Sequence, residues 1–173
     1  MLCRSGALDA IVDDRFSGCK HFWMSCIQDK PKNEKKLEEN IKLYSPETDF
    51  TREEKIEFVT DLTGMFPFDL VMTREIRDSI ERNCVPALGN WDAALGGAWF
   101  IPRQVAVKKT KNGKTYWVVK AIDDTSTMTT IRCWGVKEQD QIHLNRPYAA
   151  KLDHNKDWGF STRSVRHTFK LLG

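Results

Sequence analysis

The chain has 173 residues, of which 40% are hydrophobic, and a formal net charge of +3. This length suits one ordinary domain or two small ones, each with a modest core. The five cysteines are odd in number and form no CxxC pair, which argues against a disulfide framework and a zinc ribbon. There is no signal-peptide pattern and no run of about 18 apolar residues, so we expect a cytoplasmic protein without a membrane segment.

The charge is unevenly distributed along the chain. Residues 1–97 contain 13 Lys/Arg and 18 Asp/Glu, whereas residues 98–173 contain 14 Lys/Arg and 6 Asp/Glu. A basic surface attracts polyanions, so any nucleic acid should bind mainly to the second part. We predict an α+β protein with a helical module over residues 1–97 and a β-rich module over residues 98–173.

The start of the first module predicts a helix and a linker. Asp13 or Asp14 can cap a helix that runs to about Asp29 and carries apolar residues at helical spacing. Residues 29–40 are highly charged and include a proline, which indicates a solvated linker that turns helical toward Leu43.

Two further helices are predicted before the β-rich module. Thr51 and Glu54 form a capping-box pattern, in which hydroxyl and carboxylate each accept from a backbone N–H at a helix start. Gly64 is expected to end that helix. The next helix should begin after Thr73 and stop before Pro86.

From Ala98 onward the hydrophobic pattern alternates, as in strands. Asn112 and Gly113 form a strong hairpin turn, because both can adopt positive φ. Five strands are predicted, over residues 99–109, 115–122, 129–134, 148–153 and 160–172. Five short strands with a longer gap between the third and fourth indicate an OB-fold-like barrel, and an SH3-like barrel is the structural alternative.

Strand alternation separates a core side from an outer side. Lys120 must stay in water, and this sets the outer side of the second strand. The outward set is then Tyr116, Val118, Lys120, Arg132 and Trp134, and the inward set is Trp117, Val119, Ala121, Ile131 and Cys133.

The outward residue types suit single-stranded nucleic acid. An aromatic ring can stack on any base and contributes about 1–3 kcal/mol, while Lys and Arg supply salt-dependent affinity for the backbone. The predicted binding residues are Tyr116 and Trp134 for stacking, Lys108, Lys109, Lys111, Lys114, Lys120 and Arg132 for phosphates, and Arg163 and Arg166 on the last strand as further candidates.

Structural roles compete with binding at several of these positions. Lysines at a hairpin tip also serve solubility and protect a sheet edge. Trp134 can instead lie buried under the connection that follows it. Trp117 is expected in the core.

No catalytic centre, metal site or cofactor is predicted. Asp123 and Asp124 would point to opposite sides of a strand, and they suit a turn. The four histidines have no metal-ligand spacing, and no Gly-rich loop or nucleophile elbow is present. The sequence favours a binding module over a self-sufficient enzyme.

Three segments resemble landmarks of one protein family. The segment KKTKNGKTYWVVKAIDD (residues 108–124) resembles the TKKGxxxAFVTLED-like opening of the OB domain in bacterial C-family DNA polymerase III alpha subunits. Upstream, SGALD (residues 5–9) resembles the family's KAGAFD, and LTGMFPFD (residues 62–69) resembles the end of EKExLGFYLSGHPLD. Phe66 stands where the family has His before Pro, and Leu8 stands where Phe is usual.

The resemblance implies a role in DNA replication. It implies the end of a helix-hairpin-helix DNA-binding region followed by an OB domain that binds single-stranded template DNA, with other replisome subunits as further partners. The catalytic aspartates of such a polymerase lie upstream, so we expect this chain to be a non-catalytic C-terminal fragment of a bacterial or phage enzyme.

Two other functions remain open from the sequence. One is an OB-type module of another enzyme that binds RNA or tRNA. The other is a protein-interaction barrel in a replisome, whose hairpin lysines contact an acidic partner.

Overall fold

A computed structural model describes residues 2–125 and 127–172 of the chain. The chain divides into two compact units, Met1–Leu70 and Val71–Gly173. The first is helical, and the second contains the sheet. The protein therefore combines helices with a curled sheet, as the α+β prediction requires.

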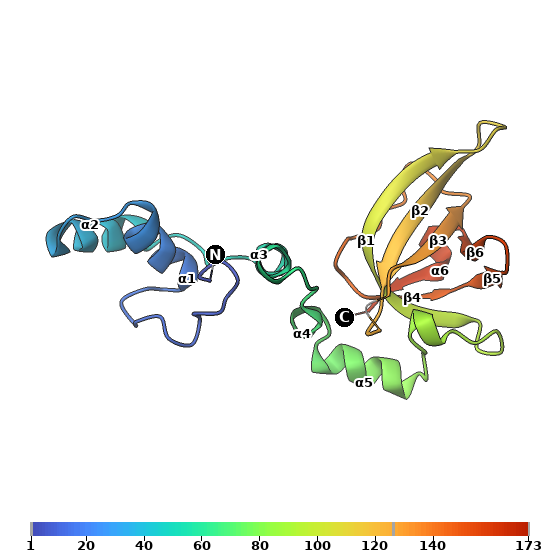
Figure 1. Cartoon of the computed structure of the whole chain (residues 1–173), viewed down its shortest axis with the longest axis horizontal. Coiled ribbons are helices and arrows are strands. Elements are labelled where there is room, and N and C mark those ends of the chain that lie inside the picture. The colour runs from blue at the N-terminus through green and yellow to red at the C-terminus, as the bar shows by residue number, and fades with distance from the viewer. Residues whose placement is uncertain (1, 126, 173) are drawn as a thin grey trace. The chain divides into compact units, whose positions relative to one another are not determined.

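The first unit begins with turns and a short bundle of helices. Helix α1 (Cys19–Phe22) continues directly into the π-helical segment η1 (Trp23–Gln28), and α2 (Glu34–Tyr44) lies beside them (Figure 1). Two predictions are wrong in part here. The helix expected from Asp13 begins only at Cys19, and most of the expected linker is α2, because Asn33 caps it by accepting from the Lys36 N–H at 2.9 Å.

Buried polar side chains join these helices. The His21 Nδ1 accepts from the Ser17 N–H at 3.0 Å, so its Nε2 carries the proton and donates to the Ile41 carbonyl at 2.8 Å. Asn40 donates to the Ser25 carbonyl at 3.1 Å. Since both side chains are buried, these bonds offset the cost of removing them from water.

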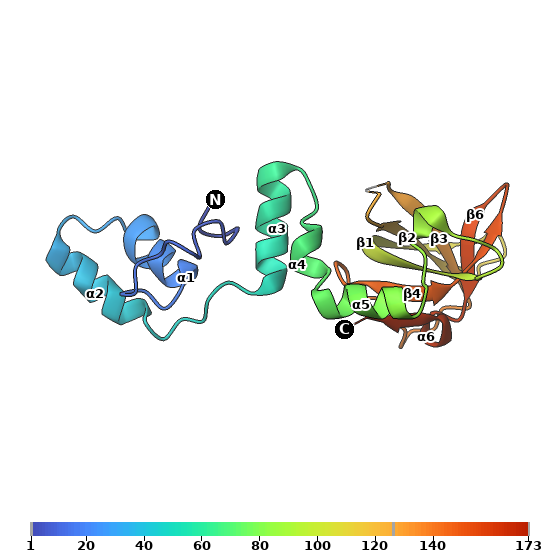
Figure 2. The same ribbon diagram turned by 90° about the horizontal axis from the view of Figure 1, so that it is seen from below.

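Helix α3 (Arg52–Thr63) confirms the capping-box prediction (Figure 2). The Thr51 hydroxyl accepts from the Glu54 N–H at 3.2 Å, and the Glu54 carboxylate accepts from the Thr51 N–H at 2.8 Å. Gly64 ends the helix with φ +70°, as expected of a left-handed cap. A four-residue helix, α4 (Phe68–Val71), follows.

The second unit starts with a helix at its predicted position. Thr73 caps α5 (Arg74–Arg82), and a short 3-10 turn, η2 (Leu88–Asn90), precedes the sheet. The seven strands are β1 (Gly97–Lys109), β2 (Thr115–Ile122), β3 (Thr129–Trp134), β4 (Tyr148–Lys151), β5 (Asp153–Asn155), β6 (Gly159–Arg163) and β7 (Phe169–Leu171).

The strand pairing curls the sheet around its own core (Figure 1). The strand order is β5-β6-β3-β2-β1-β4-β7. The long β1 uses residues 97–100 to pair with β4 and residues 101–109 to pair with β2, with a bulge between Pro102 and Gln104. All these pairs are antiparallel except β3 with β6, which is parallel.

The structure has seven strands where the sequence predicts five. The bounds of β2 and β3 agree with the prediction. The predicted fourth strand is shorter and is followed, after the buried Leu152, by β5. The predicted last strand is broken at Ser164, whose φ of +59° is incompatible with an extended chain, and the short helix α6 (Val165–Thr168) separates β6 from β7.

The inner side of the sheet forms the core of the second unit. Val119, Ile131 and Cys133 are fully buried there, and Trp117 packs against the same cluster, as strand alternation predicts. Burial raises the pKa of the Cys133 thiol to about 12. Within residues 2–125 and 127–172, no helix is both long and apolar enough to cross a membrane.

Candidate nucleic-acid interface

A row of aromatic and basic side chains crosses the outer side of four strands. The register pairs Lys108 of β1 with Tyr116 of β2, and Trp134 of β3 with Arg163 of β6. The rings of Tyr116 and Trp134 stack on one another, with centroids 4.5 Å apart and planes inclined by 24°. Two rings therefore lie between two cations along one line of the sheet.

Trp134 lies in this stacked pair, outside the core. Both rings are half-buried, and neither belongs to the core cluster of the second unit. A stacked cross-strand pair also holds β2 to β3, since such contacts contribute about 0.5–1.5 kcal/mol beyond area burial. The exposed part of the pair remains accessible to a ligand.

The neighbouring rows add further cations. Arg132 lies on the outer side opposite Val118, and the exposed Lys120 lies opposite Thr130. The Arg132 guanidinium donates to the Trp158 carbonyl and lies 6.0 Å from the centre of the Trp158 ring. These contacts fix an arginine and a tryptophan together at the edge of the same surface.

Trp158 is a candidate that the sequence analysis missed. It lies between β5 and β6, and 64% of its surface is exposed. In the sequence, Trp158 directly follows the polar residues 154–157 and lies 26 positions after Arg132. A tryptophan directly after a polar stretch was the available signal, because such a large apolar ring has little structural use in water. We call Lys108, Tyr116, Lys120, Arg132, Trp134, Trp158 and Arg163 the aromatic-basic face.

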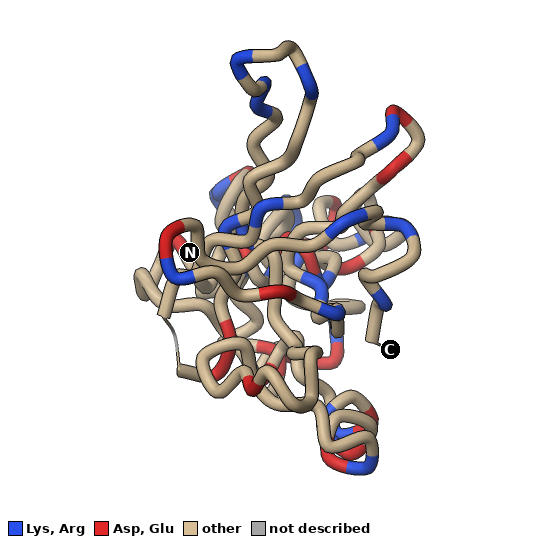
Figure 3. Tube along the Cα trace, turned by 90° about the vertical axis from the view of Figure 1, so that its right-hand side faces the viewer, with Lys and Arg blue, Asp and Glu red and all other residues tan. Residues whose placement is uncertain are grey.

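The hairpin between β1 and β2 extends the positive charge beyond this face. Residues 102–122 contain six Lys/Arg and no Asp/Glu, and the hairpin rises at the top of Figure 3 with its basic residues in blue. Lys111 and Lys114 lie in its turn. Lys109 pairs with Thr115 and alternates with Lys108, so it belongs to the opposite side of the ribbon.

Arg166 does not join the predicted surface. It lies on α6, which interrupts the strand on which it was expected. Arg163, by contrast, lies on β6 directly beside Trp134. The two arginines were predicted together because both fall in the single strand expected over residues 160–172, and the break at Ser164 places them on different elements.

The acidic pair after β2 has a structural role. Asp123 is buried and accepts from the Gly89 N–H and from the Thr125 N–H and hydroxyl, so it fastens η2 and the turn after β2. The predicted turn at Asp123 and Asp124 is confirmed. Across residues 2–125 and 127–172, no group of three or more His, Cys, Asp or Glu side chains is arranged to hold a metal ion.

Comparison with models of known protein families gives no match for this chain. Comparison with curated proteins gives none either. Its function must therefore be inferred from the residues of the aromatic-basic face, and the resemblance to polymerase III alpha subunits stays a prediction.

Proposed function

We propose that the second unit is an OB-type domain that binds single-stranded DNA on the aromatic-basic face. The strand pairing supports this fold. Leu152 alone separates β4 from β5, so the two act as one bent strand that pairs with β1 at one end and with β6 at the other. Counted in this way, β1, β2, β3, β4–β5 and β6 make a five-stranded barrel, and β7 is an added edge.

The position of the aromatic-basic face also supports the proposal. OB-folds bind oligonucleotides on the face of their second and third strands and on the loops that join strands one to two and four to five. In this chain Tyr116 and Trp134 lie on that face, Lys111 and Lys114 lie in the first of these loops, and Trp158 lies in the second.

The stacked pair between Lys108 and Arg163 is the observation that carries the proposal. Bases stack on aromatic rings without regard to sequence, while flanking cations neutralise phosphates on either side. The spacing of cation, two rings and cation along one row of the sheet fits a strand that crosses β1, β2, β3 and β6.

The polymerase resemblance adds a biological setting to this proposal. In that setting the domain would hold single-stranded template DNA for a catalytic centre elsewhere in the parent enzyme. DNA binding is carried over from the resemblance, and nucleotidyl transfer is not.

Fluorescence-anisotropy titrations of the full chain test the proposal. The probes are labelled oligo(dT), a duplex and a single-stranded RNA, each at two salt concentrations. We expect oligo(dT) to bind more tightly than the duplex, with an affinity that falls as salt rises. A preference for RNA would favour the RNA-binding alternative. Negligible affinity for all three probes would refute nucleic-acid binding and favour a protein partner.

The hairpin lysines provide a charge-specific test with a matched control. Replacing Lys111 and Lys114 by Ala should reduce the slope of log affinity against log salt by about 1.4, since each phosphate contact with a single strand contributes about 0.7. Replacing Lys35 and Lys42 by Ala removes the same charge from exposed positions on α2 and should leave the slope unchanged. Equal effects of the two double variants would refute a specific role for the hairpin.

A further inference from the structure

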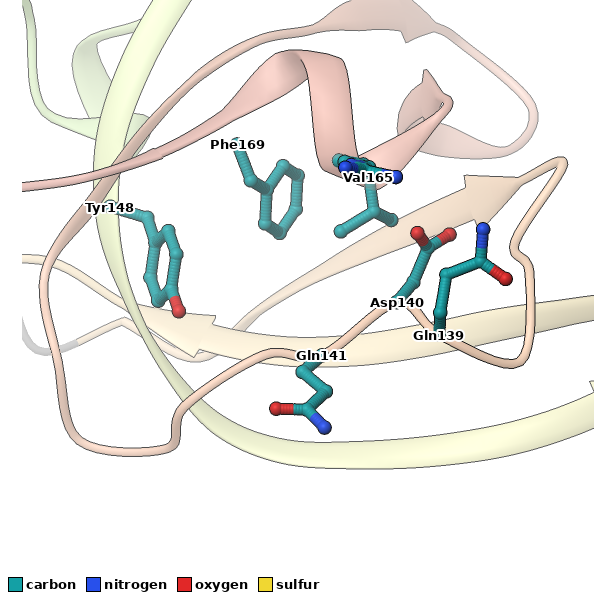
Figure 4. A pocket seen from close by; sticks show the side chains of 7 residues that line it. Gln139, Asp140, Gln141, Tyr148, Val165 and Phe169 are labelled. Atoms are coloured by element: carbon teal, nitrogen blue, oxygen red, sulfur yellow. The ribbon is translucent and has the colours of Figure 1, made fainter.

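A separate pocket lies beside α6, and none of its lining residues belongs to the aromatic-basic face. It has a volume of about 410 Å³, which is within the usual range of small-molecule sites. Tyr148, Val165 and Phe169 form an apolar wall, and Gln139, Asp140 and Gln141 come from the connection between β3 and β4 (Figure 4). Arg166 completes the lining.

Asp140 carries an unused hydrogen-bond acceptor inside this pocket. Its Oδ2 accepts from the Lys137 N–H at 2.8 Å, which closes a turn in the connection. Its Oδ1 is buried and has no hydrogen-bond donor among the residues that the structure describes, and the whole residue is only 8% exposed. In Figure 4 the carboxylate points toward the side of the pocket where Val165 lies. A buried acceptor without a donor is costly, so a ligand that donates to it gains a strong interaction.

The surrounding groups restrict the chemistry of the ligand. Tyr148 is held in place because its hydroxyl accepts from the His143 N–H at 3.0 Å, and its ring lies 5.8 Å from that of Phe169. These two rings and Val165 suit a flat apolar body. Arg166 is exposed and can bind an anion, whereas the buried Asp140 Oδ1 requires an N–H donor. The ligand should therefore have a ring, a donor nitrogen and a negative charge.

We propose that this pocket binds a nucleotide whose base carries an amino group, with Asp140 Oδ1 accepting from that amino group and Arg166 binding the phosphate. A carboxylate that accepts from the cytosine amino group is a standard means of reading that base. A carbonyl oxygen at the same position would instead face the carboxylate as a second acceptor. This inference depends on the pocket alone and stands independently of strand binding on the aromatic-basic face.

Calorimetric titration of the full chain with dCMP and dUMP tests the inference. The two nucleotides share ring size, sugar and phosphate and differ at the position that would meet Asp140. We expect dCMP to bind at least about tenfold more tightly than dUMP. Equal affinities, or no binding of either at millimolar concentration, would overturn the proposal.

Asp140→Asn gives a sharper test, because its expected effect is a reversal. The Lys137 N–H still needs an acceptor, so the amide oxygen of the new side chain should stay on it and the amide NH2 should point into the pocket. The variant should then prefer dUMP to dCMP. Loss of the preference without loss of folding, judged by circular dichroism, would agree with a role in recognition, whereas an unchanged preference for dCMP would overturn it.

Arg166→Gln keeps the test informative even if the Asp140 variant fails to fold. Arg166 is exposed, so its replacement should not affect folding. It should weaken dCMP several-fold and leave deoxycytidine, which lacks the phosphate, unchanged. Arg74→Gln removes an equal charge from an exposed position on α5 and should alter neither. If Arg166→Gln has no more effect on dCMP than Arg74→Gln, the phosphate assignment is wrong.

Oligonucleotides distinguish a free nucleotide from a base within a strand. If a base of a bound strand enters the pocket, oligo(dC) should bind more tightly than oligo(dT), and Asp140→Asn should remove the difference. If the ligand is a free nucleotide, the two oligonucleotides should bind alike while dCMP still binds more tightly than dUMP. Both outcomes support nucleotide binding in the pocket. If dCMP does not bind but oligo(dT) does, only the pocket proposal fails and the proposal for the aromatic-basic face stands.

Discussion

Replacing Trp134 by Ala tests whether the stacked pair contacts bases. The change removes one ring of the pair that lies between Lys108 and Arg163. Stacking of one base on an aromatic ring contributes about 1–3 kcal/mol, so affinity for oligo(dT) should fall by about 5- to 150-fold. The salt slope should stay nearly unchanged, because no phosphate contact is lost.

The same substitution also affects stability, and the two effects can be separated. Losing the stacking contact with Tyr116 should lower the free energy of unfolding by about 0.5–1.5 kcal/mol beyond the effect of the lost area burial, measured by denaturant titration of the folded chain. Trp91→Ala is a suitable control, since Trp91 packs against the core and lies outside the aromatic-basic face. It should lower stability without weakening oligo(dT) binding by the folded protein.

The double variant of Tyr116 and Trp134 completes this test. The two rings are in contact, so their effects on binding should not add. The account would be refuted if Trp134→Ala lowered stability and left the affinity of the folded protein for oligo(dT) unchanged. That result would mean that the pair stabilises the packing of β2 against β3 and does not contact bases.

Three other substitutions and one labelling experiment have clear expected outcomes. Trp158→Ala should weaken oligo(dT) binding in the anisotropy assay and barely change stability, because its ring is 64% exposed. In thiol labelling at pH 8, the exposed Cys84 should react quickly, whereas Cys133, whose burial raises its pKa to about 12, should react only after denaturation. Thr51→Ala should cost about 1 kcal/mol of unfolding free energy through loss of the cap of α3. Burial opposes ionisation of Asp49, but hydrogen bonds from two backbone N–H groups and a lysine outweigh it and lower its pKa, so its carboxylate stabilises the fold above the ordinary Asp pKa of about 3.9. Asp49→Asn should therefore lower the free energy of unfolding near pH 7 and weaken its decline as the pH falls below about 4, as measured by denaturant titration at several pH values.

Local sequence patterns predicted the parts of the fold that depend on neighbouring residues. The capping box at Thr51 and the bounds of β2 and β3 follow from hydrogen-bonding side chains and alternation within a few positions. Alternation also predicted which side of β2 and β3 is buried, because one face of each strand must pack on the core.

Features that depend on an unusual backbone conformation or on contacts distant in sequence could not be predicted in this way. The break at Ser164 requires a left-handed backbone that serine rarely adopts, and the break divides the predicted last strand. Trp158 joins the aromatic-basic face only because β6 pairs in parallel with β3 and brings it to Arg132. The unpaired Oδ1 of Asp140 is a further example, because the path of the connection between β3 and β4 decides that Asp140 lines the pocket.

An NMR titration that follows tryptophan indole N–H resonances tests strand binding on the aromatic-basic face most directly. The chain has six tryptophans, so each resonance can be assigned by single substitution. On addition of oligo(dT), the resonances of Trp134 and Trp158 should shift, while that of the buried Trp99 should not. Binding that leaves the Trp134 and Trp158 resonances in place would contradict the assignment of this face to single-stranded DNA.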